Sequence, residues 1–271
     1  MSTHLPAPRI GPAPRIGIVD YANVAPLIDG LEPDWPLRRA TPARLADLLA
    51  LGELDVAILP AIELARIPGL RAIPGLGIAA DGACGSVFLF TKMPLRDVKS
   101  VTLDTASRTS AALSRILLDR EGAREIRFVK MEGGSVAERL ADADATLLIG
   151  DPALRAEWPA DVTRLDLATE WKRHVGLPFV FACWATRAGW DMAPEIRTRL
   201  EAAADRGLTR LPELAGIEAA RMGLSPESLE AYLQQLNYRL DERHVQGLRA
   251  FLDEAWRVGI LSERAELEFL R

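Results

Sequence analysis

The sequence predicts an α/β fold with a parallel sheet and a helical cover, on three observations. Short apolar strand patterns alternate with amphipathic helix patterns through the first two thirds of the 271 residues, as in βαβ units. From Ala193 to the end only helical patterns remain, and such a tail must cover a sheet that is already built. No low-complexity linker is present, so any second domain must be entered by direct strand crossings.

The first element is a strand over Arg15–Val19, which runs into a polar loop, Asp20–Asn23. Asn23 stands where a helix could begin, so a capping role and a ligand-binding role are both open. Open α/β sheets place ligands at the C-terminal ends of strands, facing helix N-termini. We therefore expect other polar groups of the site to converge on Asn23.

The next elements continue the alternation. Thr41-Pro42 supplies an N-cap and a first-turn proline for a helix that ends at Gly52. The strand Leu54–Leu59 is nearly all apolar, as a parallel strand covered on both faces should be. A helical segment, Ala61–Arg66, follows it.

A second set of strands starts near Ser86, before the helical tail. Its predicted strands are Ser86–Thr91, Val101–Leu103, Ile126–Val129, Ala145–Ile149 and Pro178–Ala185. Helices are predicted over Ser107–Leu118 and Val136–Leu140, and from Asp151, which is expected to be an acidic N-cap before Pro152. In the tail, apolar stripes within 196–208, 229–236 and 245–256 predict three helices.

Composition excludes several classes of function. The chain is 49% hydrophobic and 26% charged, as ordinary globular proteins are, and its net charge of −5 argues against a nucleic-acid partner. No apolar stretch approaches the ~20 residues that span a bilayer. The N-terminal segment lacks the apolar core of a signal peptide, so we expect a cytoplasmic protein. Cys84 and Cys183 are accordingly expected to be reduced, small buried hydrophobes.

The usual cofactor motifs are absent. The sequence contains no G-x-x-x-x-G-K-[ST], no G-x-G-x-x-G after the first strand and no G-x-S-x-G. His4, His174 and His244 are dispersed, and no Cys/His spacing indicates zinc. If the protein is an enzyme, we expect it to work without a metal or an organic cofactor.

Four polar clusters remain, each at a strand end or at the entrance to a crossing strand. They are Asp20–Asn23, Asp81–Ser86, Asp104–Ser110 and Gly150-Asp151. In the third cluster, hydroxyls and free N–H groups at a helix N-terminus would form an anion site. Arg108 would either add charge there or lie in solvent. Together the clusters predict one cleft for a small anionic molecule.

Taken in order, these motifs resemble the chorismate dehydratase family of the futalosine route to menaquinone. The pieces that carry the resemblance are Val19–Asn23 with Pro26-Leu27, Pro42–Ala46, Gly52–Val56, Asp81–Val87, Ser107–Ser110, Leu147–Asp151, and Trp171 with Gly176–Ala182. They cover nearly everything from Arg15 to Arg187, and the ordered set is more specific than any one piece.

The resemblance implies a two-lobed fold like that of type II periplasmic binding proteins, with a ligand cleft between the lobes and the helical tail as a cover. One lobe would hold residues 15–87 and 186–271, and the other residues 88–185. The chain would cross near Ser86 and again near Trp184, and residues 1–14 would be a mobile lead-in.

The implied reaction removes water from chorismate to give 3-[(1-carboxyvinyl)oxy]benzoate, without a cofactor. By resemblance, Asn23 and Ser86 would carry the chemistry. The residues expected to bind substrate are Tyr21, Ser107, Thr109, Ser110, Gly150 and Asp151. The base is open between Asp20, His174 and a carboxylate of the substrate. His174 is otherwise expected on an exposed helix end.

Asp20 departs from the family, whose members commonly have serine there. A carboxylate beside a dianionic ligand would repel it unless it points away or is paired. This departure puts a direct substrate contact from position 20 in doubt.

Two alternatives stand beside this function. The first is the sister enzyme of the same pathway, dihydroxynaphthoate synthase, although its expected first loop and convincing base histidine are missing here. The second is a non-catalytic binding protein of the same fold for a small anion, since one architecture hosts both binders and enzymes.

Overall fold

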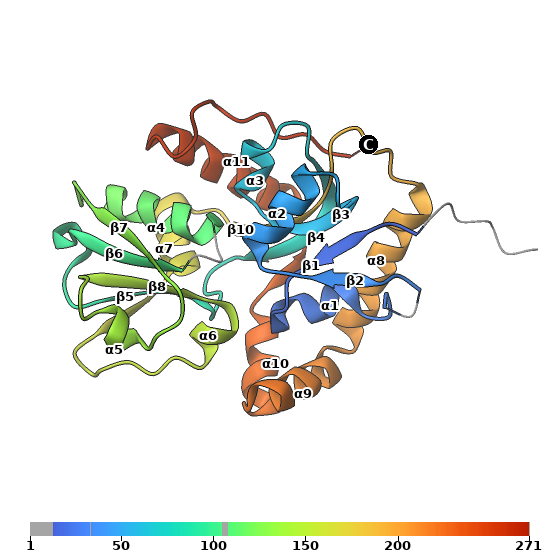
Figure 1. Cartoon of the computed structure of the whole chain (residues 1–271). Helices are drawn as coiled ribbons and strands as arrows, with labels where there is room; N and C mark the ends of the chain where they lie inside the picture. The colour runs from blue at the N-terminus through green and yellow to red at the C-terminus, as the bar shows by residue number, and fades with distance from the viewer. Residues whose placement is uncertain (1–12, 33, 105–107, 271) are drawn as a thin grey trace, which may run out of the picture.

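The computed structural model describes residues 13–32, 34–104 and 108–270, and it divides into two lobes that lie side by side (Figure 1). The sheet of the first lobe has the strand order β11-β4-β10-β3-β1-β2, and that of the second has the order β7-β6-β8-β5-β9. This two-lobed α/β architecture confirms the predicted fold class. The predicted lead-in, 1–14, lies almost wholly outside the described residues.

The elements of the first lobe combine the N-terminal quarter of the chain with its tail. Its strands are β1 (Ile16–Ile18), β2 (Leu37–Arg39), β3 (Val56–Pro60), β4 (Arg71–Ala80), β10 (Phe179–Thr186) and β11 (Asn237–Arg239). Its helices are the 3-10 turn η1 (Ala22–Val24), α1 (Ala25–Ile28), α2 (Pro42–Ala50), α3 (Glu63–Arg66), α8 (Pro194–Thr209), α9 (Leu211–Met222), α10 (Pro226–Gln234) and α11 (Glu242–Arg257).

The second lobe is made from the middle of the chain. Its strands are β5 (Val87–Thr91), β6 (Ser100–Asp104), β7 (Arg127–Met131), β8 (Ala145–Ile149) and β9 (Thr163–Asp166). Its helices are α4 (Arg108–Arg120), α5 (Val136–Arg139), α6 (Gly150–Leu154), α7 (Leu167–Val175) and the 3-10 turn η2 (Leu95–Asp97).

Both sheets are mixed, so the prediction of a parallel sheet is only partly right. β1 runs parallel to β2 and β3, and β6 runs parallel to β7 and β8. The strands that connect the lobes break the pattern: β10 is antiparallel to β3 and β4, and β5 is antiparallel to β8 and β9. A strand that arrives from the other lobe enters its sheet from the opposite end and therefore runs against its neighbours.

Two predictions about the C-terminal part need correction. The tail is not purely helical, because β11 pairs with β4 at the edge of the first sheet. The predicted return crossing near Trp184 falls inside β10, which pairs with β3 and β4 from Phe179 to Thr186. We therefore propose a lobe boundary before β10, around residues 176–178, in place of 185/186.

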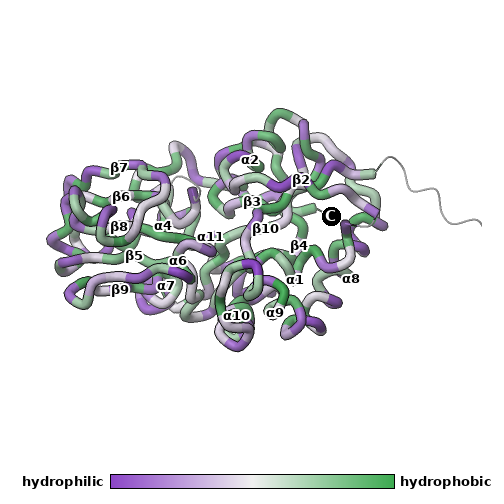
Figure 2. Tube along the Cα trace, turned by 60° about the horizontal axis from the view of Figure 1, so that its bottom comes forward, coloured by the Kyte–Doolittle hydropathy of each residue, from purple (hydrophilic) through white to green (hydrophobic). Residues whose placement is uncertain are grey.

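Apolar side chains join the two lobes as well as filling them. One cluster of buried residues includes Ile18 and Leu59 of the first lobe and Leu147 of the second. In the hydropathy-coloured trace, green stretches run through the inside of both lobes, whereas purple stretches lie mostly at the periphery, in helices and edge strands as well as in turns (Figure 2). Within the described residues, no helix combines the length and the apolar character needed to cross a membrane.

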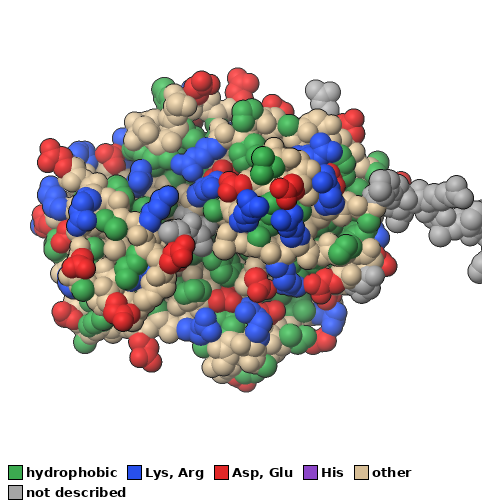
Figure 3. Space-filling model, viewed as in Figure 1, with side chains coloured by type: hydrophobic (Ala, Val, Ile, Leu, Met, Phe, Trp, Pro, Cys, Tyr) green, Lys and Arg blue, Asp and Glu red, His purple; other side chains and the backbone are tan. Residues whose placement is uncertain are grey.

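Acidic and basic side chains alternate over the surface. On the face drawn in Figure 3, blue and red groups are interspersed across both lobes. Many of them form ion pairs, such as Arg38 with Glu53 and Arg39 with Glu32. This mixture agrees with the net charge of −5 and gives the displayed face no phosphate-binding stripe.

Candidate active site between the lobes

A cavity lies where the lobes meet, and its empty volume, counted together with the solvent at its mouth, is about 600 Å³. Its described lining comes from both lobes and both crossings: Val19, Tyr21, Asn23, Pro42, Ile58, Leu59, Pro60, Ile78, Cys84, Ser86, Val87, Ser110, Ile149, Gly150, Phe181, Ala182 and Leu236. Strand ends supply most of it, as expected for an open α/β sheet. Five of the predicted site residues belong to this lining: Tyr21, Asn23, Ser86, Ser110 and Gly150.

Asn23 does not cap a helix. It lies inside η1, and the helix that follows, α1, has Val24 as its N-cap without any side-chain capping bond. The Asn23 Oδ1 atom is buried and has no hydrogen-bond partner among the residues that the structure describes. A buried amide oxygen without a partner is costly, and a ligand hydroxyl in the cavity would satisfy it.

Ser86 is buried at the first crossing, immediately before β5. Its backbone carbonyl accepts a hydrogen bond from Gly150 N–H at 2.8 Å, so the crossing is tied to the end of β8. Its Oγ accepts a hydrogen bond of 3.0 Å from the hydroxyl of Tyr232 in α10. Tyr232 is a site neighbour that the sequence does not reveal, because at helical spacing it reads as an ordinary core residue.

Tyr21 and Gly150 meet across the cavity from opposite lobes. Gly150 has a φ of +60°, and a Cβ placed on it would lie 3.2 Å from the Tyr21 ring. Burial, followed by the charges of Asp104 and Asp151, raises the pKa of the Tyr21 hydroxyl, so Tyr21 is neutral at physiological pH.

Asp151 holds the lobes together and does not line the cavity. Its Oδ1 accepts from Ala22 N–H at 3.1 Å, and its Oδ2 accepts from Arg221 of α9 at 2.6 Å. The predicted N-cap role is therefore wrong: Ile149 is the N-cap of α6, without any side-chain capping bond. Asp151 instead fixes the loop that carries Asn23.

The start of α4 is also largely occupied by contacts between the lobes. Thr109 Oγ1 accepts from Ile62 N–H at 3.2 Å, and Thr109 does not line the cavity. Arg108 is neither an anion ligand nor free in solvent, because it pairs with Asp47 at 3.1 Å and with Glu63 at 3.3 Å. Ser110 does line the cavity, and Ser107 lies outside the described residues.

Both side-chain candidates for the base lie away from the cavity lining. Asp20 is exposed and pairs with Arg39 at 2.9 Å, so it is both turned outward and neutralised. His174 in α7 contacts Glu121 at 2.9 Å, on the second lobe. Among the described lining residues none carries a charge, and burial raises the pKa of the Cys84 thiol well above its ordinary value.

Asp166, at the end of β9, is a second neighbour of the site that sequence reasoning missed. Its carboxylate accepts from the backbone N–H groups of Cys84 at 3.0 Å and Gly85 at 2.8 Å, and it also caps α7. It therefore fixes the residues just before Ser86. In the sequence, Asp166 is an ordinary N-cap aspartate before Leu-Ala-Thr, a pattern that does not indicate its hydrogen bonds to the backbone of Cys84 and Gly85.

Among the described residues, one group has carboxylate and imidazole atoms close enough to share a metal ion: Glu121, Glu170 and His174. Arg173 pairs with both glutamates, which neutralises them, and none of the three lines the cavity. Cys84 and Cys183 are free and buried, as predicted, and burial raises the pKa of Cys183 to about 12.

The fold and the site together define a two-lobed protein with a small-molecule cavity between its lobes. Solved structures agree with this class. A protein from Archaeoglobus fulgidus aligns with a TM-score of 0.72 at 16% identity, covering 92% of this chain and 98% of that one. The alkanesulfonate-binding protein of Xanthomonas axonopodis pv. citri aligns with a TM-score of 0.60 at 16% identity, covering 94% and 96%. At such identities the likeness concerns the fold alone.

Sequence comparison identifies the family within this class of two-lobed proteins. A family model described as menaquinone biosynthesis matches residues 14–257, and the chain belongs to this family. It is 36% identical over 256 residues to the chorismate dehydratase of Thermus thermophilus, covering 88% of this chain and 93% of that protein. The chorismate dehydratase of Campylobacter jejuni is 27% identical over 175 residues, covering 61% and 64%.

Proposed function

We propose that this protein is a chorismate dehydratase that removes water from chorismate to give 3-[(1-carboxyvinyl)oxy]benzoate. The observation that supports it most is that Asn23 Oδ1 has no hydrogen-bond partner among the described residues and that Asn23 lines the same cavity as Ser86. Its support in sequence is the identity of 36% to a chorismate dehydratase over most of both chains. We also propose that the enzyme is a hydro-lyase and needs no cofactor.

The reaction depends more on the orientation of the bound substrate than on a strong acid or base. Loss of a ring proton and of the neighbouring hydroxyl makes the ring aromatic, so the product supplies the driving force. The C–H electron pair becomes part of the aromatic system, and the hydroxyl leaves with a proton as water. Asn23 would orient the departing hydroxyl, and Ser86 would donate a hydrogen bond to it or to a carboxylate.

A carboxylate of the substrate would serve as the base. Asp20 and His174 are both outside the described lining, and each is engaged by another charged or ionisable side chain. The described lining residues that can ionise are Tyr21 and Cys84, and each has a raised pKa that keeps it protonated. A carboxylate of the bound substrate is therefore the base that we propose.

Substrate carboxylates would be held by hydrogen bonds. Ser110 belongs to the first turn of α4, where the helix dipole favours an anion. Ser107 and Thr109 remain predicted ligands, although the Thr109 hydroxyl already accepts from Ile62. We also propose a cytoplasmic location, which the free, buried cysteines support.

The test is to incubate the purified, chelator-treated protein with chorismate and follow the products by mass spectrometry. The proposed function predicts conversion to a product lighter by one water, at a rate that chelation does not change. Chorismate that binds and stays intact would support the alternative of a non-catalytic anion-binding protein. Conversion that needs an added metal would contradict the cofactor-independent part.

A further inference from the structure

Tyr232 is buried in the helical tail, yet its hydroxyl reaches the catalytic candidates. The residue is 4% exposed, and its hydroxyl lies 3.0 Å from Ser86 Oγ. The ring packs over the crossing segment, since a Cβ added to Gly85 would lie 3.3 Å from it. α10 therefore places the phenol of Tyr232 next to the Ser86 hydroxyl.

The direction of this hydrogen bond follows from the groups around Tyr232. Burial raises the pKa of Tyr232 well above its usual value, so the phenol keeps its proton. The protonated phenol has one hydrogen to donate, and Ser86 Oγ accepts it.

We propose that Tyr232 is a positioning residue that orients the Ser86 hydroxyl for the reaction, an inference that rests on the proposed dehydratase function. Because Ser86 Oγ accepts from Tyr232, the hydrogen of Ser86 must be donated elsewhere, and the cavity that Ser86 lines is where a substrate oxygen would accept it. Tyr232 would thus direct the Ser86 hydroxyl, as a hydrogen-bond donor, into the cavity.

The test replaces Tyr232 by phenylalanine, which removes the hydroxyl and keeps the ring. We expect kcat to fall by about 10- to 100-fold, the scale for loss of orientation, with KM changed by less than about threefold. Tyr238→Phe is the matched control, since Tyr238 is also buried and its hydroxyl has no hydrogen-bond partner among the described residues. Its kcat should equal that of the wild type.

A double-variant comparison separates positioning from a structural role. If Tyr232 acts through Ser86, Tyr232→Phe in a Ser86→Ala background should cause no further loss of kcat. This comparison also works if Tyr232→Phe folds poorly alone, because the double variant leaves no polar atom of the pair unpaired. A further 10-fold loss in the double variant, or wild-type kcat in the single one, would overturn the inference.

The wild-type protein in the same assay distinguishes this inference from the function on which it rests. Wild-type turnover with an unaffected Tyr232→Phe variant would refute the role of Tyr232 alone. Absence of turnover by the wild type would refute the dehydratase function, and the positioning role with it.

Discussion

Gly150 brings the backbone of the second lobe against the Tyr21 ring, where no other residue type fits without strain. We predict that Gly150→Ala raises KM for chorismate by about 10-fold, with a smaller change in kcat. The added Cβ would sit 3.2 Å from the ring, and the φ of +60° disfavours any side chain. Steady-state kinetics measure this effect.

Gly52→Ala is the control for this prediction. Gly52 has a φ of +70°, so it shares the backbone strain, but a Cβ there would meet nothing within 4 Å. Both variants should lose about 1 kcal/mol or more of stability. A rise in KM in both, or in neither, would remove the Tyr21–Gly150 contact from substrate binding.

Individual residues also show what sequence alone can establish. Asn23 and Asp151 both stand at the start of a helix with side chains typical of an N-cap, yet neither caps its own helix. Asp151 accepts from Ala22 of the other lobe, a partner 129 positions away. Local spacing predicts a cap, whereas contacts between lobes depend on the whole fold.

Helix α8 supports the Asn23 loop through a glycine contact. Gly207 lies so close to α1 that an added Cβ would fall 2.0 Å from the Pro26 carbonyl oxygen. We predict that Gly207→Ala destabilises the protein by about 1–3 kcal/mol, because this backbone contact outweighs the gain in helix propensity. Denaturant unfolding measures the loss.

Gly216→Ala in α9 provides the contrast for this prediction. Gly216 is also helical, and nothing lies within 4 Å of its added Cβ. That substitution should be neutral or stabilising by up to about 1 kcal/mol. If both alanine variants gain stability, α8 is not packed on α1 as described.

Elements differ in how well sequence predicts them. β3 is a continuous apolar run, and its predicted strand agrees with the structure to within two residues. β4, the longest strand, is not predicted, because Pro74, Gly75 and Gly77 interrupt its pattern. Gly77 is needed there because β10 passes so close that a Cβ would lie 2.5 Å from the Ala182 carbonyl oxygen.

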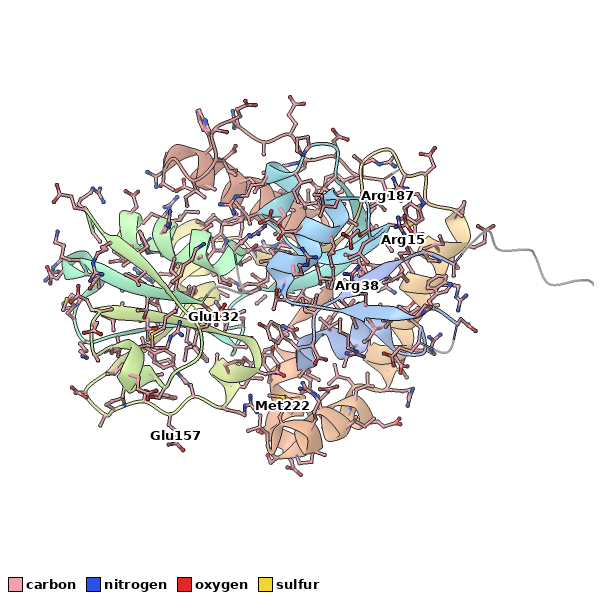
Figure 4. The ribbon with its side chains drawn as sticks, in the orientation of Figure 1. Arg15, Arg38, Glu132, Glu157, Arg187 and Met222 are labelled. Atoms are coloured by element: carbon pink, nitrogen blue, oxygen red, sulfur yellow. The ribbon has the colours of Figure 1, made fainter. Side chains whose placement is uncertain are left out.

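At the scale of the whole molecule, one carboxylate joins three parts of the first sheet. Asp55, just before β3, accepts from Arg15 before β1 and from Arg187 after β10, with contacts of 2.8–3.0 Å. Arg15 and Arg187 lie near one another in the first lobe (Figure 4). The hydrogen bond from Arg15 is the main cause that lowers the pKa of Asp55 to about 2.

This lowered pKa predicts a pH-dependent stability. The pKa of Asp55 is lower in the folded state than its unfolded value near 4. The stabilisation that the ionised carboxylate gives the folded protein is therefore complete above pH 4 and is lost as pH falls toward 2. We expect Asp55→Asn to cost about 1–2 kcal/mol at pH 7, allowing for the half-exposed Arg15. The difference in free energy of unfolding between the wild type and Asp55→Asn should shrink in unfolding curves measured from pH 4 to pH 2. A difference that stays constant with pH would contradict this role of the Asp55 carboxylate.

The arrangement of lobes is predictable from sequence in outline but not in detail. The four polar clusters indicate one cleft, and five of the predicted residues line the cavity. Thr109 and Asp151 are turned to contacts between the lobes, and Tyr232 arrives from the helical tail. The order of residues in the chain does not show which hydroxyl or carboxylate will form a hydrogen bond with a distant element.

We propose that Asn23, in a cavity whose described lining bears no charge, carries the dehydration together with Ser86. The most direct measurement is kcat and KM of Asn23→Ala with chorismate, with the fold of the variant checked by thermal unfolding. We predict a kcat lower by ~100-fold or more, the scale for loss of one preorganised polar group, in a variant that stays folded. Near-normal turnover by that variant would contradict the account.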